Sequence, residues 1–111
     1  MSLSIIIVNY NTEELLINCI SSIYANISID NFEIIVVDNG STDNSLSSLK
    51  ERFPNVICVC NQKNRGFGAA NNQGVAISKY DYLFFLNSDT IIEHDIFSEL
   101  LFFMQKHQSC A

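Results

Sequence analysis

The chain has 111 residues, with 12 acidic and 6 basic side chains and a formal net charge of -6. An apolar share of 48% can build a core, which excludes a disordered chain, and the length suits one domain over residues 1–111. The acidic balance lacks the basic face that nucleic acids require, so no nucleic-acid partner is expected. The apolar runs, the longest at residues 5–8, 83–86 and 100–104, are far shorter than the roughly 20 residues of a transmembrane helix.

The first half of the chain alternates between strand and helix patterns. Residues 3–8 form a continuous isoleucine-rich run, typical of a strand that is covered on both faces. A helical pattern follows, in which Asn11 and Glu14 have the spacing of a capping box and Thr12 is an alternative cap. Residues 32–37 predict a second buried strand. Ser41 or Thr42 then begins a helix that ends at Pro54.

The second half continues the alternation. Residues 56–59 predict a third strand and residues 66–78 a helix, whose inner side carries Ala70, Gly74 and Ile77. Small residues on that side allow the helix to approach the sheet closely, although Gly74 costs ~1 kcal/mol relative to alanine. Residues 82–86 predict a fourth strand, and residues 93–106 a last helix with apolar residues on more than one face.

Four strands that alternate with helices through short links predict an α/β fold. The expected architecture is a three-layer, Rossmann-like parallel sheet with right-handed crossovers.

Polar side chains follow every predicted strand. Because ligands bind at the carboxyl edge of an open parallel sheet, these residues are the candidates for a binding site. In chain order they are Asn9, Tyr10 and Asn11; Asp38 and Asn39; Asn61, Lys63, Asn64 and Arg65; and Asn87, Ser88 and Asp89. Tight turns and helix caps select the same residue types, so each group taken alone also fits turn chemistry.

The two carboxylates at strand ends are the strongest candidates for chemistry. Asp38 directly follows a buried strand, and Asp89 comes three residues after Leu86. Such carboxylates accept hydrogen bonds from a base or hold a hard cation through oxygen. For Asp38 the alternative is a turn that leads into the next helix.

The glycine pattern excludes two common nucleotide sites. Gly66 and Gly68 begin a G-x-G pattern, but Asn71 stands where the dinucleotide fingerprint needs glycine, and the pattern follows the third strand rather than the first. No G-x-x-x-x-G-K-S/T phosphate loop is present. An NAD enzyme and a P-loop nucleotidase are therefore both disfavoured.

The cysteines indicate no metal centre. Cys19, Cys58, Cys60 and Cys110 have no zinc-type spacing to each other or to a histidine. They are interpreted as buried, reduced thiols of a cytosolic protein, without a chemical role.

Four strings in order along residues 4–100 resemble the family 2 glycosyltransferases, and most of all their rhamnosyltransferase-like group. The strings are SIIIVNYN at residues 4–11, EIIVVDNGSTD at 33–43, NRGFGAANNQG at 64–74 and LFFLNSDT at 83–90. The resemblance implies the N-terminal, nucleotide-sugar-binding half of a GT-A fold.

The resemblance also implies roles for individual residues. The loop with Asn9, Tyr10 and Asn11 would contact the nucleoside, and Asp38, next to Asn39, would bond the base. The third string would lie against the nucleotide and its sugar. Its implied contact residues are Arg65, Gly66, Asn71 and Asn72.

The metal-binding D-x-D motif of the family reads here as Asn87, Ser88 and Asp89. Asparagine replaces the first carboxylate, so Asp89 is the single implied metal ligand, for Mg²⁺ or Mn²⁺. Asn87 is left to bond the ribose or a water, and Lys63 and Arg65 are candidate helpers at the diphosphate. Magnesium prefers few protein carboxylates together with phosphate oxygens and waters, so the motif remains compatible with a metal-bound diphosphate.

Members of this family carry a second half that binds the acceptor and supplies the general base for an inverting transfer. The chain is expected to be the donor half without that part, and no residue is assigned as the base. His94 and His107 are interpreted as solvent-facing. The fourth strand would then lie on an open edge, which predicts a homo-oligomer through that strand or the last helix.

The leading hypothesis is a glycosyltransferase domain for a nucleotide-diphosphate sugar and a polysaccharide or glycolipid acceptor. The alternative is a non-catalytic nucleotide-binding or interaction module derived from such an enzyme. A sugar nucleotidyltransferase is disfavoured, because the first loop has no glycine- and lysine-rich segment. By analogy with such relatives, the expected location is cytoplasmic, near the inner face of the membrane.

Overall fold

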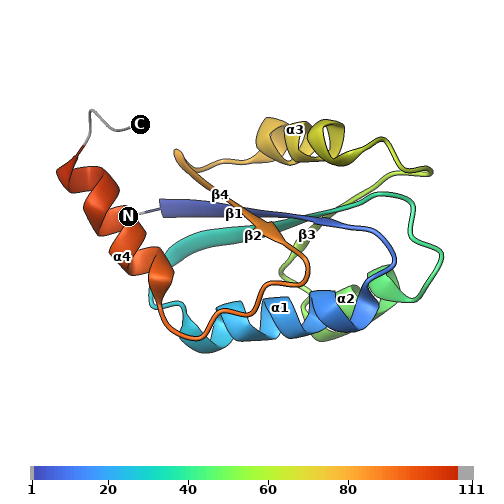
Figure 1. Cartoon of the computed structure of the whole chain (residues 1–111), viewed down its shortest axis with the longest axis horizontal. Coiled ribbons are helices and arrows are strands. Elements are labelled where there is room, and N and C mark those ends of the chain that lie inside the picture. Colours follow the sequence, from blue (N-terminus) through green and yellow to red (C-terminus); the bar gives the residue numbers. More distant parts are fainter. Residues whose placement is uncertain (1, 108–111) are drawn as a thin grey trace.

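The computed structural model describes residues 2–107, which form a four-stranded, fully parallel sheet in the order β3-β2-β1-β4. In Figure 1, α1 and α2 lie on one side of the sheet and α3 lies on the other. The elements are β1 (Ser2–Asn9), α1 (Glu13–Asn26), β2 (Asn31–Asp38), α2 (Ser45–Arg52), β3 (Ile57–Cys60), α3 (Phe67–Ile77), β4 (Tyr82–Asn87) and α4 (Ile96–Lys106). The predicted three-layer α/β fold is confirmed.

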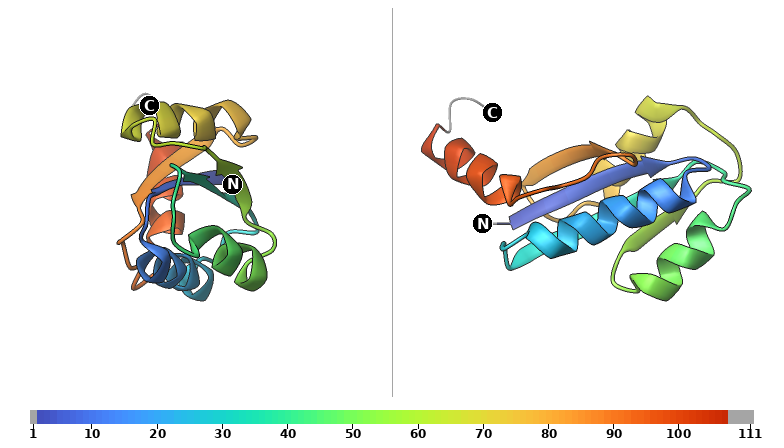
Figure 2. Two further views of the ribbon diagram at one scale, coloured as in Figure 1. Left: turned by 90° about the vertical axis from the view of Figure 1, so that its right-hand side faces the viewer. Right: turned by 60° about the horizontal axis from the view of Figure 1, so that its bottom comes forward.

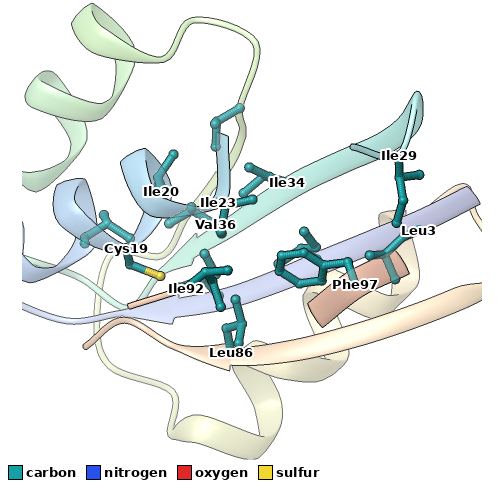
Figure 3. Close-up of a cluster of buried hydrophobic side chains, with 14 of the residues drawn as sticks. Leu3, Cys19, Ile20, Ile23, Ile29, Ile34, Val36, Leu86, Ile92 and Phe97 are labelled. Atoms are coloured by element: carbon teal, nitrogen blue, oxygen red, sulfur yellow. The ribbon is translucent and has the colours of Figure 1, made fainter. Parts of the chain in front are cut away.

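The central strands β1 and β2 are buried on both faces, because alternate residues point into opposite layers. Toward α1 the core gathers side chains from both strands, α1, β4 and α4 (Figure 3). They include Leu3, Ile5, Ile7, Ile20, Ile23, Ile34, Val36, Leu86, Ile92 and Phe97. Toward α3 a smaller cluster contains Ile6, Ile35, Val37 and Ala70. Two-sided burial explains why both strands are continuous apolar runs.

The helix α3 packs very close to the sheet. A Cβ atom on Gly74 would stand 2.6 Å from Cγ2 of Ile6, so the position needs glycine. The predicted small inner face, Ala70 and Gly74, is therefore confirmed. Ile77 was predicted to share that face, but its side chain is exposed, because α3 ends there and the chain turns into extended backbone at Ser78.

The predicted capping box at the start of α1 is wrong. Thr12 is the N-cap residue, but its own side chain makes no capping hydrogen bond, and the backbone N–H of Glu13 donates instead to Asp43 Oδ2 at 3.2 Å. Asn11 instead takes a left-handed backbone conformation with φ 51°, and its Oδ1 accepts hydrogen bonds from the backbone N–H groups of Thr42 and Asp43. The side chain that should have capped α1 joins the loop after β1 to the loop after β2.

The start of α2 also differs from the prediction. The helix begins at Ser45, with Asn44 as its N-cap residue, rather than after Ser41 or Thr42. The Ser41 hydroxyl is used elsewhere, because it donates to Asp38 Oδ1 at 2.6 Å.

The last helix begins three residues later than predicted. Asp95 precedes α4 and accepts from the backbone N–H of Ser98, so the helix starts at Ile96. Phe97 and Leu101 are buried in the core, whereas Leu100, Phe102 and Phe103 are exposed. The prediction of apolar residues on more than one face is thus confirmed. Figure 2 shows α4 at the end of the sheet where β1 begins, far from the carboxyl edge.

Among residues 2–107, none of the helices combines the length and the apolar character that crossing a membrane would require.

Candidate functional site at the carboxyl edge of the sheet

The carboxyl ends of all four strands meet at one edge of the sheet. Asn9 pairs in register with Asp38, Val8 pairs with Asn87, and Asp38 pairs with Cys60. Polar residues that are far apart in sequence therefore lie next to each other, as the parallel arrangement predicts.

A pocket of ≈ 380 Å³ opens at this edge. Its lining combines polar, apolar and aromatic side chains from the ends of β1 and β4, the loops that follow the strands, and the first turns of α1 and α3. The lining residues are Val8, Tyr10, Thr12, Leu15, Asn39, Asn64, Phe67, Asn87, Ser88 and Asp89. Six candidate residues from the sequence are thus brought together: Tyr10, Asn39, Asn64, Asn87, Ser88 and Asp89.

Two aromatic rings are exposed in the pocket. Tyr10 is 48% exposed and Phe67 is 56% exposed, so both rings present accessible apolar surface to the pocket. Phe67 was not predicted as a site residue. Its signal in the sequence was an aromatic residue between Gly66 and Gly68, at the expected start of a helix.

Asp38 lies beneath the pocket rather than in its lining. Its side chain is 1% exposed, and its carboxylate accepts from Asn9 Nδ2 at 2.9 Å, from the backbone N–H of Ser41 at 2.9 Å and from the Ser41 hydroxyl. The bond to the N–H three residues later is the local turn that stood as the alternative interpretation of Asp38. As placed here, the carboxylate organises the loop after β2.

Asn9 is fully buried and connects Asp38 to the pocket. Its Oδ1 accepts from the Thr12 hydroxyl at 2.6 Å. The Thr12 oxygen in turn lies 3.0 Å from the Ser88 hydroxyl. Side-chain hydrogen bonds therefore run from β2, through β1, to the loop that carries Asp89.

Asn39 holds the loop between β3 and α3 against the sheet. Its Nδ2 donates to the carbonyl of Gly66 at 3.2 Å, and its Oδ1 accepts from the backbone N–H of Arg65 and from Asn61 Nδ2, both at 3.1 Å. Asn61 and Gln73 exchange two further hydrogen bonds, at 2.7 and 2.8 Å. This buried carboxamide network was not predicted. The sequence did contain a signal for it, because Asn61 directly follows the third strand, as Asn9 and Asp38 follow the first two.

Like Asn9, Asn11 and Asp38, four further predicted site residues lie outside the pocket lining. Arg65 lines a neighbouring hollow of ≈ 480 Å³ with Lys63 and Cys60. Gly66 is the N-cap residue of α3, with φ 87°. Asn71 and Asn72 lie on α3, half-buried and exposed respectively, and neither lines the pocket.

Among the described residues that line the pocket, Asp89 is the charged one, and its side chain is exposed. Burial of Cys19 and the nearby charge of Asp89 together raise the pKa of the Cys19 thiol to about 11. Residues 2–107 contain no group of three or more His, Cys, Asp or Glu side chains that could hold a metal ion by themselves. Any cation here would need most of its ligands from a bound molecule or from water.

The remaining titratable candidates do not join the site. His94 and His107 are exposed, as predicted. Cys19 is buried and Cys58 is half-buried, but Cys60 is exposed, so the prediction of uniformly buried thiols is wrong. Cys60 is the last residue of the edge strand β3, where the core no longer covers the sheet. Cys110 lies outside the described residues.

A parallel three-layer domain with a polar and aromatic pocket at its carboxyl edge has the architecture of a nucleotide-binding α/β domain. The chain belongs to glycosyl transferase family 2, whose family model matches residues 4–111.

Similar proteins agree with this assignment. A putative glycosyltransferase, EpsH of Bacillus subtilis, is 34% identical over 102 residues, which are 90% of this chain and 29% of EpsH. A poly(ribitol-phosphate) beta-glucosyltransferase of Bacillus spizizenii is 34% identical over 114 residues, which are 98% of this chain and 18% of that protein. The chain therefore spans less than a third of the length of these relatives.

Solved structures show the same fold. The Staphylococcus aureus protein TarS, residues 1-349, in complex with UDP-GlcNAc, superposes with a TM-score of 0.86 and 26% identity, over 97% of this chain and 32% of that one. This match confirms the predicted GT-A fold. A Pyrobaculum calidifontis mannosyltransferase in complex with GDP-Man and Mn²⁺ shares the fold, with a TM-score of 0.73 and 24% identity, over 80% of this chain and 28% of that one. The finer likeness to rhamnosyltransferases stays a prediction.

Proposed function

We propose that this chain binds the nucleotide-diphosphate sugar of a glycosyltransferase in the pocket at the carboxyl edge of the sheet. The supporting observation is that Tyr10, Asn39 and Asp89, from three different strand ends, line one pocket. The complex of TarS with UDP-GlcNAc supports a UDP-linked donor as the first to test.

The lining suggests how the parts of the donor are recognised. The exposed rings of Tyr10 and Phe67 offer stacking surfaces for a base, and Asn39 and Asn64 are polar partners at the same opening. Asp38 acts on the nucleoside by holding the loop after β2 in place. Arg65 and Lys63, in the adjoining hollow, attract the negatively charged phosphates.

The residues at the end of β4 fit a divalent cation that is shared with a diphosphate. Asp89 supplies one exposed carboxylate, and Asn87 and Ser88 supply neutral oxygens beside it. Mg²⁺ at phosphate sites takes one or two protein carboxylates and completes its shell with phosphate oxygens and water, so the lack of a three-residue cluster agrees with this role. Mg²⁺ or Mn²⁺, when bound, would stabilise the negative charge of the departing nucleoside diphosphate.

The proposed reaction is an inverting transfer of the sugar to a hydroxyl of a polysaccharide or glycolipid. A poly-beta-1,6-N-acetyl-D-glucosamine synthase of Staphylococcus aureus, 35% identical over 88 residues, supports a polysaccharide acceptor. Those residues are 78% of this chain and 21% of that protein. The acceptor hydroxyl needs a general base, and no residue described here is assigned to that role.

Calorimetric titration with UDP, dTDP and GDP, each with Mn²⁺ or with EDTA, tests the proposal. At least one nucleotide is expected to bind, and more tightly with Mn²⁺. Asp89→Ala should abolish the gain from Mn²⁺, whereas Asp30→Ala should preserve it, because Asp30 is an exposed carboxylate at the opposite end of the sheet. Binding of none of the three nucleotides would instead favour a non-catalytic interaction module.

A further inference from the structure

The side-chain hydrogen bonds under the pocket form one continuous path from Asp38 to Ser88. Asp38 accepts from Asn9, Asn9 accepts from Thr12, and Thr12 lies 3.0 Å from the Ser88 hydroxyl. The path crosses from β2 through β1 to the loop after β4, over 76 residues of sequence between Thr12 and Ser88. Asn9 and Thr12 have no role of their own in the proposed function, and of these two Thr12 lines the pocket.

The chemistry of the groups determines the direction of every proton in the path. Three donors surround the Asp38 carboxylate, so it accepts and the NH₂ group of Asn9 must face it. The Asn9 oxygen then faces Thr12 and can only accept. A threonine hydroxyl has a single proton, which is therefore given to Asn9. Because the Thr12 proton is already used, the Ser88 hydroxyl must be the donor in its contact with the Thr12 oxygen.

From this order we infer that Thr12 is a positioning residue that makes Ser88 an acceptor toward the pocket. The Ser88 proton points down into the path, so its oxygen presents lone pairs to the space beside Asp89. An oxygen held in this state suits a hard cation or the water bound to one, and is unsuited to donating to a phosphate. The inference rests on the proposed function, because it assigns Ser88 to the cation proposed beside Asp89.

Hydroxyl variants of Thr12 separate this role from simple packing. Thr12→Val keeps the shape but removes both hydrogen bonds, so Ser88 is free to turn its proton toward the pocket. The gain in UDP affinity on going from EDTA to Mn²⁺ should fall about five- to tenfold, as expected for one hydrogen bond of roughly 1 kcal/mol. Thr12→Ser retains the hydroxyl and should keep the wild-type gain within about twofold.

Two further variants keep the test decisive if Thr12→Val folds poorly, since it leaves the buried Asn9 oxygen without a donor. Ser88→Ala removes the hydroxyl oxygen proposed to face the cation but leaves the bond between Thr12 and Asn9. The increase in UDP affinity that Mn²⁺ brings should fall in this variant as it does in Thr12→Val. Ser22→Ala is the matched control. It removes a hydroxyl that joins α1 to the backbone of Ile92, away from the pocket lining, and should not change the gain.

The outcomes distinguish this inference from the proposed function. Wild-type protein that binds UDP equally in Mn²⁺ and EDTA refutes the proposed cation, and the role of Ser88 with it. A wild-type gain that persists in Thr12→Val refutes the role of Thr12, and a gain that persists in Ser88→Ala refutes the assignment of Ser88 to the cation. Neither result contradicts the proposed cation beside Asp89. Equal losses in EDTA and in Mn²⁺ would show that Ser88 contacts the nucleotide itself, which also overturns the inference.

The proton order has a readout that needs no ligand. In wild-type protein, NMR should show slow solvent exchange for the side-chain amide protons of Asn9, because both ends of this buried group are bonded. Exchange should stay slow in Thr12→Ser and accelerate in Thr12→Val. Equal protection in all three proteins would refute the proposed path.

Discussion

Asn9 marks the point where a buried strand becomes a binding edge. It follows Leu3, Ile5 and Ile7 on the same face of β1, but its carboxamide is as buried as they are. Burial of an amide is tolerable only when its groups are hydrogen-bonded, and here Asp38, Ser41 and Thr12 supply the partners. A single polar residue thus connects the core to the pocket.

The rates at which the cysteines react test how deeply each thiol is buried. Cys19 is buried and its pKa is raised to about 11 by burial and by the charge of Asp89, while burial also raises the pKa of Cys58. Only thiolates are alkylated, so at about pH 8 iodoacetamide should modify exposed Cys60 well before Cys58 or Cys19. Peptide mapping by mass spectrometry measures each rate. Modification of Cys19 as fast as Cys60 would contradict the described burial.

Among the helices of residues 2–107, α4 is the one whose N-cap side chain makes a capping hydrogen bond. Asp95 accepts hydrogen bonds from the backbone N–H and the hydroxyl of Ser28, and from the same two groups of Ser98. The helix is thereby bonded to the segment that leads into β2. Burial raises the pKa of Asp95, but the hydrogen bonds from Ser28 and Ser98 outweigh it, so the pKa lies below its usual value.

The stability provided by this cap should depend on pH. Because the pKa is lowered in the folded state, the contribution is complete above the usual carboxyl value and is lost as pH falls through the lowered one. Asp95→Ala should reduce the free energy of unfolding by about 1–2 kcal/mol at neutral pH, the usual cost of a lost cap. Urea denaturation at neutral pH and at about pH 2 measures the difference, which should nearly vanish in acid.

The control for this prediction is Glu99→Ala, which removes an exposed acid from the first turn of the same helix. Its effect should stay within a few tenths of a kcal/mol. A cost for Asp95→Ala that is equal at both pH values would show that the carboxylate charge is not involved.

At the scale of the whole molecule, the β4 edge of the sheet exposes apolar surface. Leu83 and Phe85 are exposed on this edge strand, and an apolar hollow of ≈ 610 Å³ lies between β4 and α4, lined in part by Phe84, Phe97 and Leu100. The hollow is larger than the polar pocket but lies away from it, so it has no part in the proposed chemistry. Exposed apolar edge strands pair readily with other chains.

We therefore expect this chain to form a homo-oligomer through β4 or α4. Phe85→Lys should shift the chain toward the monomer, because a charge on an edge strand opposes pairing and Phe85 is half-exposed already. Light scattering at tens of micromolar measures the mass of both proteins. Ile91→Lys serves as the control, since Ile91 is similarly exposed but lies beyond the strand. A wild-type monomer would contradict the prediction.

The two central strands were predictable from the sequence. The runs at residues 3–8 and 32–37 identified strands within a residue or two, because burial on both faces leaves an uninterrupted apolar signal. Helix starts were less predictable. Asn11 and Ser41 have the right types for caps, but the Asn11 side chain accepts from Thr42 in the other loop, and the Ser41 hydroxyl donates to Asp38 and accepts from the Asn11 N–H. Local spacing does not reveal such competition.

The sequence by itself determined the α/β class, the family and the gathering of polar residues at one edge, since parallel strands place all their carboxyl ends together. Only the tertiary structure decided which of those residues face the pocket. Asp38 and Asn9 are buried and bond to each other across 29 positions of sequence, whereas Tyr10, Phe67 and Asp89 remain exposed. The physical reason is that hydrogen-bond partners depend on strand order and register, which bring distant residues together and which no local pattern encodes.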